Sequence, residues 1–245
     1  MDFVRLLLGA GMAMAATSLG AAGVIAFRRI SARLYAWIIS FCAGMMAFSS
    51  LEMFNEAHVH SGHRIAFGSL LAGLLVFSIV GRLLPHAHAL LLGNEMPGPK
   101  RKAALLAGTI TIHNIPEGFA IASAFAQSPA LGWLVAICIA LQDVPEGLMV
   151  AAPVACYGVS TRRSFFWGVF SGVAEFTAAI AGFLFLRSVS SVTPLALGFS
   201  AGTMTYVVFF ELLPDAVRSE SPHIAVGAFV AGIAVAYGLS ALIGA

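Results

Sequence analysis

Two six-residue segments of this sequence carry ionisable and amide side chains at matching positions. HNIPEG occupies residues 113–118 and QDVPEG occupies residues 142–147. Each residue of an α-helix turns by about 100°, so the first, second and fifth residues of each segment share one face, with the glutamate between the other two. These faces present His113, Asn114 and Glu117 in the first segment and Gln142, Asp143 and Glu146 in the second. Both faces group donor atoms that could bind a cation.

The donor types indicate which cation would bind. Imidazole together with carboxylate favours zinc and other first-row divalent ions, whereas magnesium and calcium sites more often use oxygen ligands alone. Glu117 and Glu146 lie in the middle of their faces, so each could serve two neighbouring ions. The amides of Asn114 and Gln142 are weak ligands, which suits release of a bound ion. Two such faces, brought together, would enclose a two-ion site.

Both segments lie inside apolar stretches, which makes their carboxylates costly. An ionised residue near the middle of a bilayer costs about 2.5–3.5 kcal/mol on insertion scales. Every Lys and Arg lies at or near a predicted membrane surface, so protons or bound cations are the plausible partners. Polar side chains that only hold helices together by hydrogen bonds are the plainer interpretation. We prefer the ion site because the pattern is doubled and contains three acids.

A proline precedes the glutamate of each segment, at Pro116 and Pro145. Proline lacks a backbone N–H and clashes with the carbonyl four residues earlier, here that of Ile112 or Leu141. A freed carbonyl and a kink beside the donors would fit a permeation path.

The elements that carry these donors are predicted to be membrane-spanning helices. The chain has 245 residues, 60% of them hydrophobic and 10% charged, and its mean hydropathy is +0.94. This composition excludes a soluble domain, and the scattered basic residues exclude a nucleic-acid surface. A span needs roughly 20 apolar residues. Eight candidate helices cover residues 3–27, 34–57, 65–92, 103–127, 131–158, 165–187, 194–216 and 222–244. We therefore expect an all-α polytopic membrane protein with a single transmembrane domain over residues 1–245.

The distribution of basic residues predicts how these helices are oriented. One side of the membrane would carry Arg28, Arg29, Arg33, Arg82, Lys100, Arg101, Lys102, Arg162, Arg163 and Arg218, and the other Arg5, Arg64 and Arg187. The side richer in Lys and Arg faces the cytoplasm. Both termini are therefore predicted outside, in a multi-pass protein of the cell membrane.

The sequence also contains two pairs of similar segments, which indicate internal repeats. TIHNIPEGFAIASAFA in the fourth predicted helix matches ALQDVPEGLMVAAPVA in the fifth, and these helices would run in opposite directions. CAGMMAFSSLEMFNEA in the second matches SAGTMTYVVFFELLPDA in the seventh, with a slip of one residue. Inverted repeats of this kind are typical of secondary transporters. They place a central metal site between the fourth and fifth helices.

HNIPEG and QDVPEG together strongly resemble the signature of the ZIP family of metal transporters, which carries this pair on its fourth and fifth helices. The resemblance extends to SGVAEFTAAIAG, to GFSAGTMTYVVFFELLPDA and to AGMM in the second predicted helix. It implies a binuclear metal centre, alternating access in which helices 1, 4, 5 and 6 move against helices 2, 3, 7 and 8, net movement toward the cytoplasm, and a homodimer.

The resemblance also implies the ligands of that centre. One ion would be held by His113, Glu117, Gln142 and Glu146, and the other by Asn114, Glu117, Asp143, Glu146 and Glu175. Met46 would contribute from the second helix, and Glu211 would be an exit ligand. Two ions per protomer would be bound as transported substrate rather than as a cofactor.

We therefore expect a transporter of divalent metal ions in the lipid bilayer, and not an enzyme. Zinc is the first candidate, and the same ligands would accept cadmium, iron, manganese or cobalt. One alternative is an intramembrane zinc-dependent hydrolase, against which the absence of HExxH and the symmetric carboxylates argue. The other is a proton-coupled carrier of another solute, which would leave His113 and the paired amides unexplained.

For several other residues we weigh a metal-related role against a structural one. His58, His60 and His63, in HVHSGH on the predicted outer side, could collect metal or belong to a short solvated loop. His86 and His88 could pass metal onward, although the membrane interface is the better explanation. Cys42, Cys138 and Cys156 share no metal-ligand spacing and are interpreted as small buried hydrophobic residues.

Overall fold

The structure, a computed structural model, describes residues 2–26, 31–92, 98–156, 158–219 and 221–244, and only the backbone of residues 84–92, 98–107, 109, 110 and 153. Within these ranges every regular element is a helix, and none of the described residues forms a strand. The all-α prediction is thereby confirmed. The histidines His86 and His88, and the arginines Arg28 and Arg29 that were used to predict orientation, lie outside the described side chains.

Nine α-helices and three shorter helical segments form the described part of the chain. In order they are α1 (Phe3–Ala22), η1 (Gly23–Ile25), α2 (Ala32–Ser61), α3 (His63–Leu92), α4 (Gly98–Gln127), α5 (Pro129–Cys156), α6 (Thr161–Ser188), η2 (Ser190–Val192), α7 (Thr193–Tyr206), η3 (Val207–Leu212), α8 (Leu213–Ser219) and α9 (Pro222–Ile243). The seventh predicted span is the continuous run from α7 through η3 to α8, and the eighth is α9. Helices α4 and α5 continue through Pro116 and Pro145 without interruption.

The connection between the second and third spans differs from the prediction. HVHSGH was expected as a short loop, but α2 continues to Ser61 and α3 begins at His63. Gly62 alone separates them, with a φ of 76° that side chains disfavour and glycine adopts readily. Polar residues can extend a helix past the apolar core, because water then satisfies their side chains. Hydropathy therefore marked the end of the apolar run and not the end of the helix.

Among the residues that the structure describes, seven helical stretches are long and apolar enough to cross a membrane. They are residues 3–25, 32–61, 63–83, 129–156, 161–188, 190–219 and 222–243. The remaining predicted span, 103–127, lies within α4, whose side chains are described at 108 and from 111 onward. The polytopic membrane fold is confirmed.

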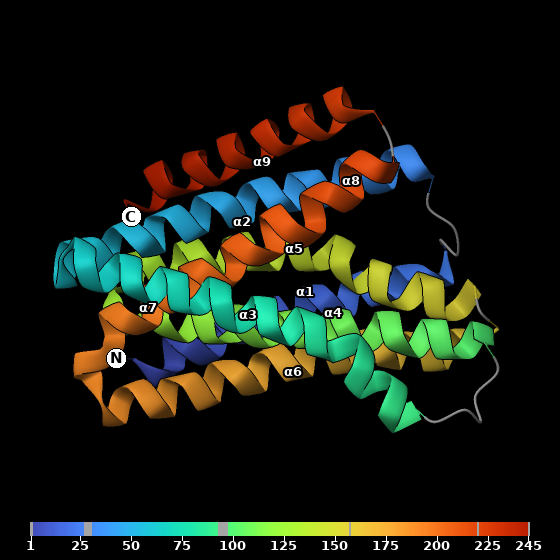
Figure 1. Cartoon of the computed structure of the whole chain (residues 1–245), viewed down its shortest axis with the longest axis horizontal. Coiled ribbons are helices and arrows are strands. Elements are labelled where there is room, and N and C mark those ends of the chain that lie inside the picture. Colours follow the sequence, from blue (N-terminus) through green and yellow to red (C-terminus); the bar gives the residue numbers. More distant parts are fainter. Residues whose placement is uncertain (1, 27–30, 93–97, 157, 220, 245) are drawn as a thin grey trace.

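The helices pack in two groups (Figure 1). Helices α1, α4, α5 and α6 contact one another extensively, and α2, α3, α7, α8 and α9 form the second group. The groups meet chiefly where α4 packs on α7 and α5 packs on α2. Both termini lie at the same end of the bundle, as an even number of spans requires. This division matches the two sets of helices that the family resemblance implied.

The glycine that closes each six-residue motif permits a close approach between helices. A Cβ added at Gly118 would lie 2.1 Å from the carbonyl oxygen of Glu175 on α6. A Cβ added at Gly147 would lie 2.0 Å from the carbonyl oxygen of Thr17 on α1. Each motif thus seats its helix directly against a neighbour, α4 on α6 and α5 on α1, as expected for small residues between membrane helices. The matching contacts agree with an inverted repeat.

Candidate metal centre

The two motifs meet at the centre of the first helical group. Helices α4 and α5 are joined by Ser128 alone and run antiparallel, so their motif faces lie side by side. Carboxylate oxygens of Glu117, Asp143 and Glu146 all lie within 4.8 Å of one another. The predicted juxtaposition of the two faces is therefore present in the fold.

Two of these three carboxylates are sealed from the surroundings, and that of Glu146 is partly buried. Glu117 is 2% exposed and Asp143 is 0% exposed. Gln142 crosses between the helices, its Nε2 donating to Glu117 Oε1 over 2.7 Å. The second oxygen of Glu117, the carbonyl oxygen of the Gln142 side chain and both oxygens of Asp143 are buried without a hydrogen-bond partner. Buried polar atoms are normally paired, so this group of free acceptors indicates a cation site.

Helix α6 contributes a fourth carboxylate. Glu175 is 0% exposed, and both of its oxygens lack a hydrogen-bond partner. It lies close enough to Asp143, Glu117 and Glu146 for their charges to repel one another. The close seating of Gly118 against the Glu175 backbone is what brings this residue to the motif faces. The resemblance implied Glu175 as a ligand, and its position suits that role.

His113 connects the cluster to the second helical group. Its Nε2 atom lies 2.6 Å from Glu211 Oε2, an ion pair when the imidazole is protonated. Glu211 belongs to η3, a π-helical turn, and such turns often occur at functional sites. The ring of Phe77 on α3 packs 5.7 Å from that of His113. The side chains of His113 and Glu211 are 15% and 24% exposed, so this pair is more accessible than Glu117 and Asp143.

The cluster has dimensions that suit a divalent transition metal. Zinc binds carboxylate oxygens at about 2.0–2.2 Å in tetrahedral geometry, which places neighbouring ligand atoms roughly 3.4 Å apart. The three carboxylates therefore need to draw together by little more than an ångström, since their oxygens lie within 4.8 Å. A divalent charge would also offset the repulsion among them.

The structure gives less information on two further predicted ligands, Asn114 and Met46. Asn114 is fully buried on α4, one residue from His113. Met46 is buried among the apolar side chains of the main core, and none of the described contacts joins its sulfur to the carboxylates. Its assignment stays a prediction.

Cys42 is a neighbour of the cluster that sequence reasoning missed. Its thiol lies 3.9 Å from the carbonyl oxygen of Gln142 and close enough to Glu117, Asp143 and Glu146 to interact with their charges. The residue is buried, as expected of a small hydrophobe, but it faces the polar centre. Its position one helical turn before Met46 was the only available signal.

The three histidines of HVHSGH do not act as one group. His60 turns toward Glu56, with Nδ1 3.4 Å from Glu56 Oε2. His58 and His63 face each other instead, with ring centroids 6.4 Å apart.

The sequence is similar to that of a known family. Residues 93–240, which include both motifs, match the model of a family described as ZIP zinc transporter.

Individual relatives extend the similarity over most of the chain. Zinc transporter ZupT of Escherichia fergusonii is 34% identical over 83% of each protein, and zinc transporter GufA of Myxococcus xanthus is 34% identical over 72% of each. A putative zinc transporter of Arabidopsis thaliana is 29% identical over 82% of this chain, which spans a third of the plant protein's length.

Proposed function

This chain belongs to the ZIP family of zinc transporters and carries divalent metal ions across a membrane, and we propose that it moves zinc toward the cytoplasm through a two-ion centre. It is a transporter and not an enzyme, which sets the hydrolase alternative aside. We further propose that residues 1–245 form one transmembrane transporter domain in the cell membrane, with both termini outside.

The observation that carries this proposal is the set of buried carboxylate oxygens without partners. Glu117, Asp143 and Glu175 together leave five such oxygens at one point where α4, α5 and α6 meet. A buried acceptor without a partner costs about 1–3 kcal/mol, and more when charged. A bound cation removes this cost, whereas a purely structural role would leave it in place.

The centre divides naturally into two overlapping ligand sets. In the proposed arrangement His113, Glu117, Gln142 and Glu146 hold one ion, and Asn114, Glu117, Asp143, Glu146 and Glu175 hold the other. Glu117 and Glu146 bridge, in keeping with their central place on the two helix faces. Met46 completes the first set from α2. The mixture of imidazole, carboxylate and amide favours zinc, with cadmium, iron, manganese and cobalt as further substrates.

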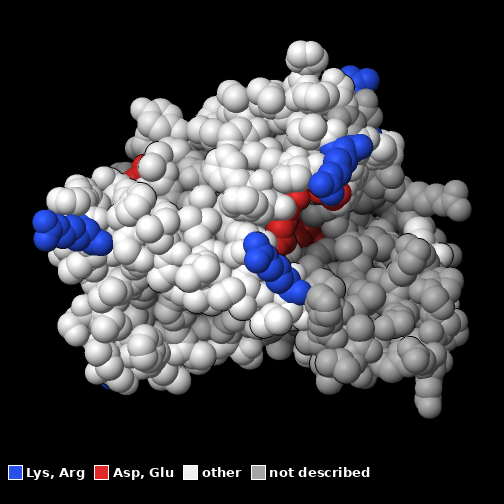
Figure 2. Space-filling view, viewed as in Figure 1, with Lys and Arg blue, Asp and Glu red and all other residues white. Residues whose placement is uncertain are grey.

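The exit proposed for the ion runs from His113 to Glu211. Acidic side chains gather in a hollow between α3 and the η3–α8 segment, with basic side chains at its rim (Figure 2). The carboxylate of Glu211 lies beside Gly81 on α3, 3.5 Å from where a Cβ would stand. This side of the centre leads toward Arg162, Arg163 and Arg218, the end that is cytoplasmic by the distribution of basic residues.

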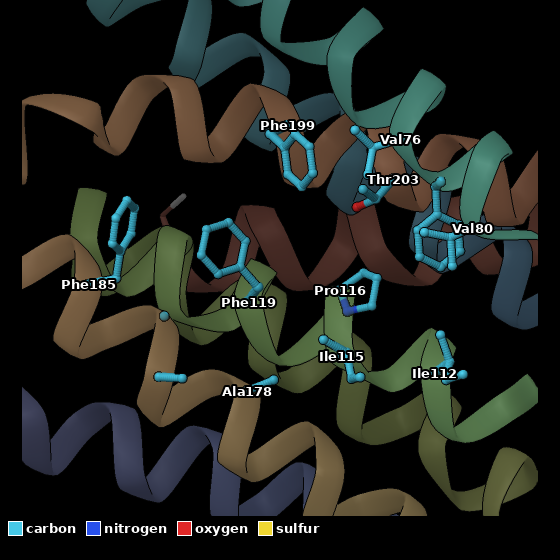
Figure 3. Close-up of a pocket in the computed structure, with 13 residues that line it drawn as sticks. Val76, Val80, Ile112, Ile115, Pro116, Phe119, Ala178, Phe185, Phe199 and Thr203 are labelled. Carbon is cyan, nitrogen blue, oxygen red and sulfur yellow. The ribbon is translucent and has the colours of Figure 1, made fainter. Parts of the chain in front are cut away.

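Alternating access requires the two helical groups to move, and their boundary is open along one stretch. An open apolar groove of about 550 Å³ lies between α4 and α6 on one side and α3 and α7 on the other. Phe119 of α4 and Phe199 of α7 meet across it edge to face, with centroids 6.4 Å apart (Figure 3). Close-packed interiors resist sliding, so a boundary that is not close-packed over this stretch favours motion of one group against the other. The homodimer implied by the resemblance stays part of this proposal.

The test is zinc influx into liposomes that enclose a zinc-responsive dye. Wild type should give saturable influx that Glu117→Ala abolishes, while Asp2→Asn, an exposed control that retains an N-cap side chain, keeps the wild-type rate. Influx that survives in correctly inserted Glu117→Ala would contradict the assigned centre. Proton flux without any metal would instead support the proton-carrier alternative.

The number of ions is tested separately by zinc binding to purified protein. Asp143→Asn combined with Glu175→Gln removes ligands of only one proposed ion. The variant should bind one zinc ion fewer per protomer than wild type does. An unchanged ratio would mean that Asp143 and Glu175 do not hold an ion of their own.

A further inference from the structure

A second group of metal-binding side chains lies near the end of α2, away from the carboxylate cluster. Glu56 and His60 are one helical turn apart, and their side chains are 33% and 46% exposed. Gln127, the last residue of α4, lies beside them. It is ten residues beyond Glu117, which corresponds to about 15 Å along the helix. This group is therefore separate from the centre described above.

Gln127 fastens α4 to α2 at this end of the bundle. Its side-chain Nε2 donates to Glu56 Oε2 over 3.3 Å and lies 2.9 Å from Nε2 of His60. Helices α2 and α4 belong to different helical groups. The amide therefore links the two groups at the end that also carries both chain termini (Figure 1).

The side chains of Glu56 and His60 are spaced to chelate a divalent ion. Nδ1 of His60 and Oε2 of Glu56 lie 3.4 Å apart. Neighbouring ligands of a tetrahedral zinc are separated by roughly the same distance. Nδ1 of His60 also lies 2.9 Å from the backbone carbonyl oxygen of Glu56, a contact that a bound ion would replace. The amide nitrogen of Gln127 cannot be a third ligand, because an NH₂ group has no lone pair to offer a cation. An ion that binds between Glu56 and His60 therefore replaces the present contacts of this amide nitrogen.

We propose that Glu56 and His60 form a shallow capture site for a divalent metal ion, and that binding there displaces the Gln127 amide and frees α4 from α2. The inference rests on the proposed function, because it places this end of the bundle outside the cell. A metal ion that arrives from outside then binds at this site. Its binding weakens the contact that holds the two helical groups together at the entrance.

Binding is tested in protein whose central site is already weakened. Purified Glu117→Gln should retain zinc binding that His60→Ala removes, as measured by calorimetric titration. His223→Ala is the matched control, because His223 is an exposed histidine at the start of α9. It should leave the titration unchanged. Binding that is equal in Glu117→Gln with and without His60→Ala would overturn the capture site.

Transport kinetics test the role of the site in otherwise wild-type protein. His60→Ala should raise KM for zinc by about tenfold or more, the range typical for loss of one group at a metal site, while kcat stays within about twofold. Gln127→Ala keeps both ligands but removes the amide contact, so KM should fall by at least about twofold, because a hydrogen bond to a carboxylate contributes at least as much as a neutral one.

The outcomes separate this inference from the proposed function. An unchanged KM in His60→Ala, with influx still abolished by Glu117→Ala, would overturn the capture site and leave the central transport site standing. An unchanged or raised KM in Gln127→Ala would overturn the role of the amide contact. Influx that persists in Glu117→Ala would contradict the proposed function whatever His60→Ala does.

Discussion

Replacing Glu117 by glutamine separates the two effects that a carboxylate has in the metal centre. The substitution keeps the shape of the side chain, and Gln142 can still donate to the oxygen of a glutamine at position 117, as it does to Glu117 over 2.7 Å. What disappears is one negative charge and the ligand oxygen that now lacks a partner. The metal-free and the zinc-bound protein should therefore respond in opposite directions.

The metal-free protein should be at least as stable as wild type. Carboxylates of Glu117, Asp143 and Glu146 lie within 4.8 Å of one another. Two unit charges at that separation repel by about 3.5 kcal/mol for an effective dielectric constant of roughly 20. Removing one charge relieves this repulsion to the extent that the neighbours are ionised. Removing a purely structural hydrogen-bonding residue would not raise stability.

The zinc-bound protein should lose most of its stabilisation. At a zinc concentration of about 100 times Kd, binding stabilises wild type by about 2.7 kcal/mol. If loss of one ligand weakens binding by about 100-fold, the same concentration equals the new Kd and stabilises the variant by only about 0.4 kcal/mol. The difference of about 2.3 kcal/mol corresponds to roughly 5–9 °C in Tm for a chain of this size.

Thermal unfolding in detergent, with zinc or with a chelator, measures both effects in one experiment. We expect a zinc-induced rise in Tm for wild type and for Asp2→Asn, and only a small one for Glu117→Gln. The reasoning is refuted if Glu117→Gln keeps the full zinc-induced rise, because the buried oxygen would then not be a ligand. A lower Tm of the chelated variant would show that Glu117 stabilises the fold instead of straining it.

Three further substitutions test neighbouring features. Gly118→Ala places a Cβ 2.1 Å from a backbone carbonyl oxygen of α6 and should lower Tm or prevent folding. Gly227→Ala is the control, because its Cβ meets nothing within 4 Å and should leave Tm unchanged. Equal Tm values of the two variants in detergent would contradict the close approach. Ala178→Phe fills part of the open apolar groove and should slow zinc influx with little change in calorimetric zinc affinity. A wild-type rate would show that the groove has no role in the motion. His113→Gln removes the contact with Glu211 and should weaken zinc binding at least tenfold; wild-type affinity would exclude His113 as a ligand.

The sequence identified the main donors because helical periodicity is a local property. Within HNIPEG and QDVPEG the 100° turn per residue places the donors on one face whatever the rest of the chain does. Length and hydropathy likewise predicted the spans, since a bilayer requires a minimum apolar run. The helix that ends at Ser61 was placed incorrectly, because water outside the bilayer lets polar residues prolong a helix and hydropathy carries no sign of it.

Packing between helices decided the rest. Glu175 reaches the other carboxylates because Gly118 packs directly against α6. His113 pairs with Glu211 because Glu211 lies in a π-helical turn, and the periodicity of the sequence does not predict such a turn. The contacts of the Cys42 thiol and of the Gln127 amide likewise arise where separate helices meet. The sequence by itself determined which chemical groups share a helix face and which segments enter the membrane. Only the tertiary structure decided which faces meet, because contacts between helices depend on the summed packing of many small residues and not on any one local pattern.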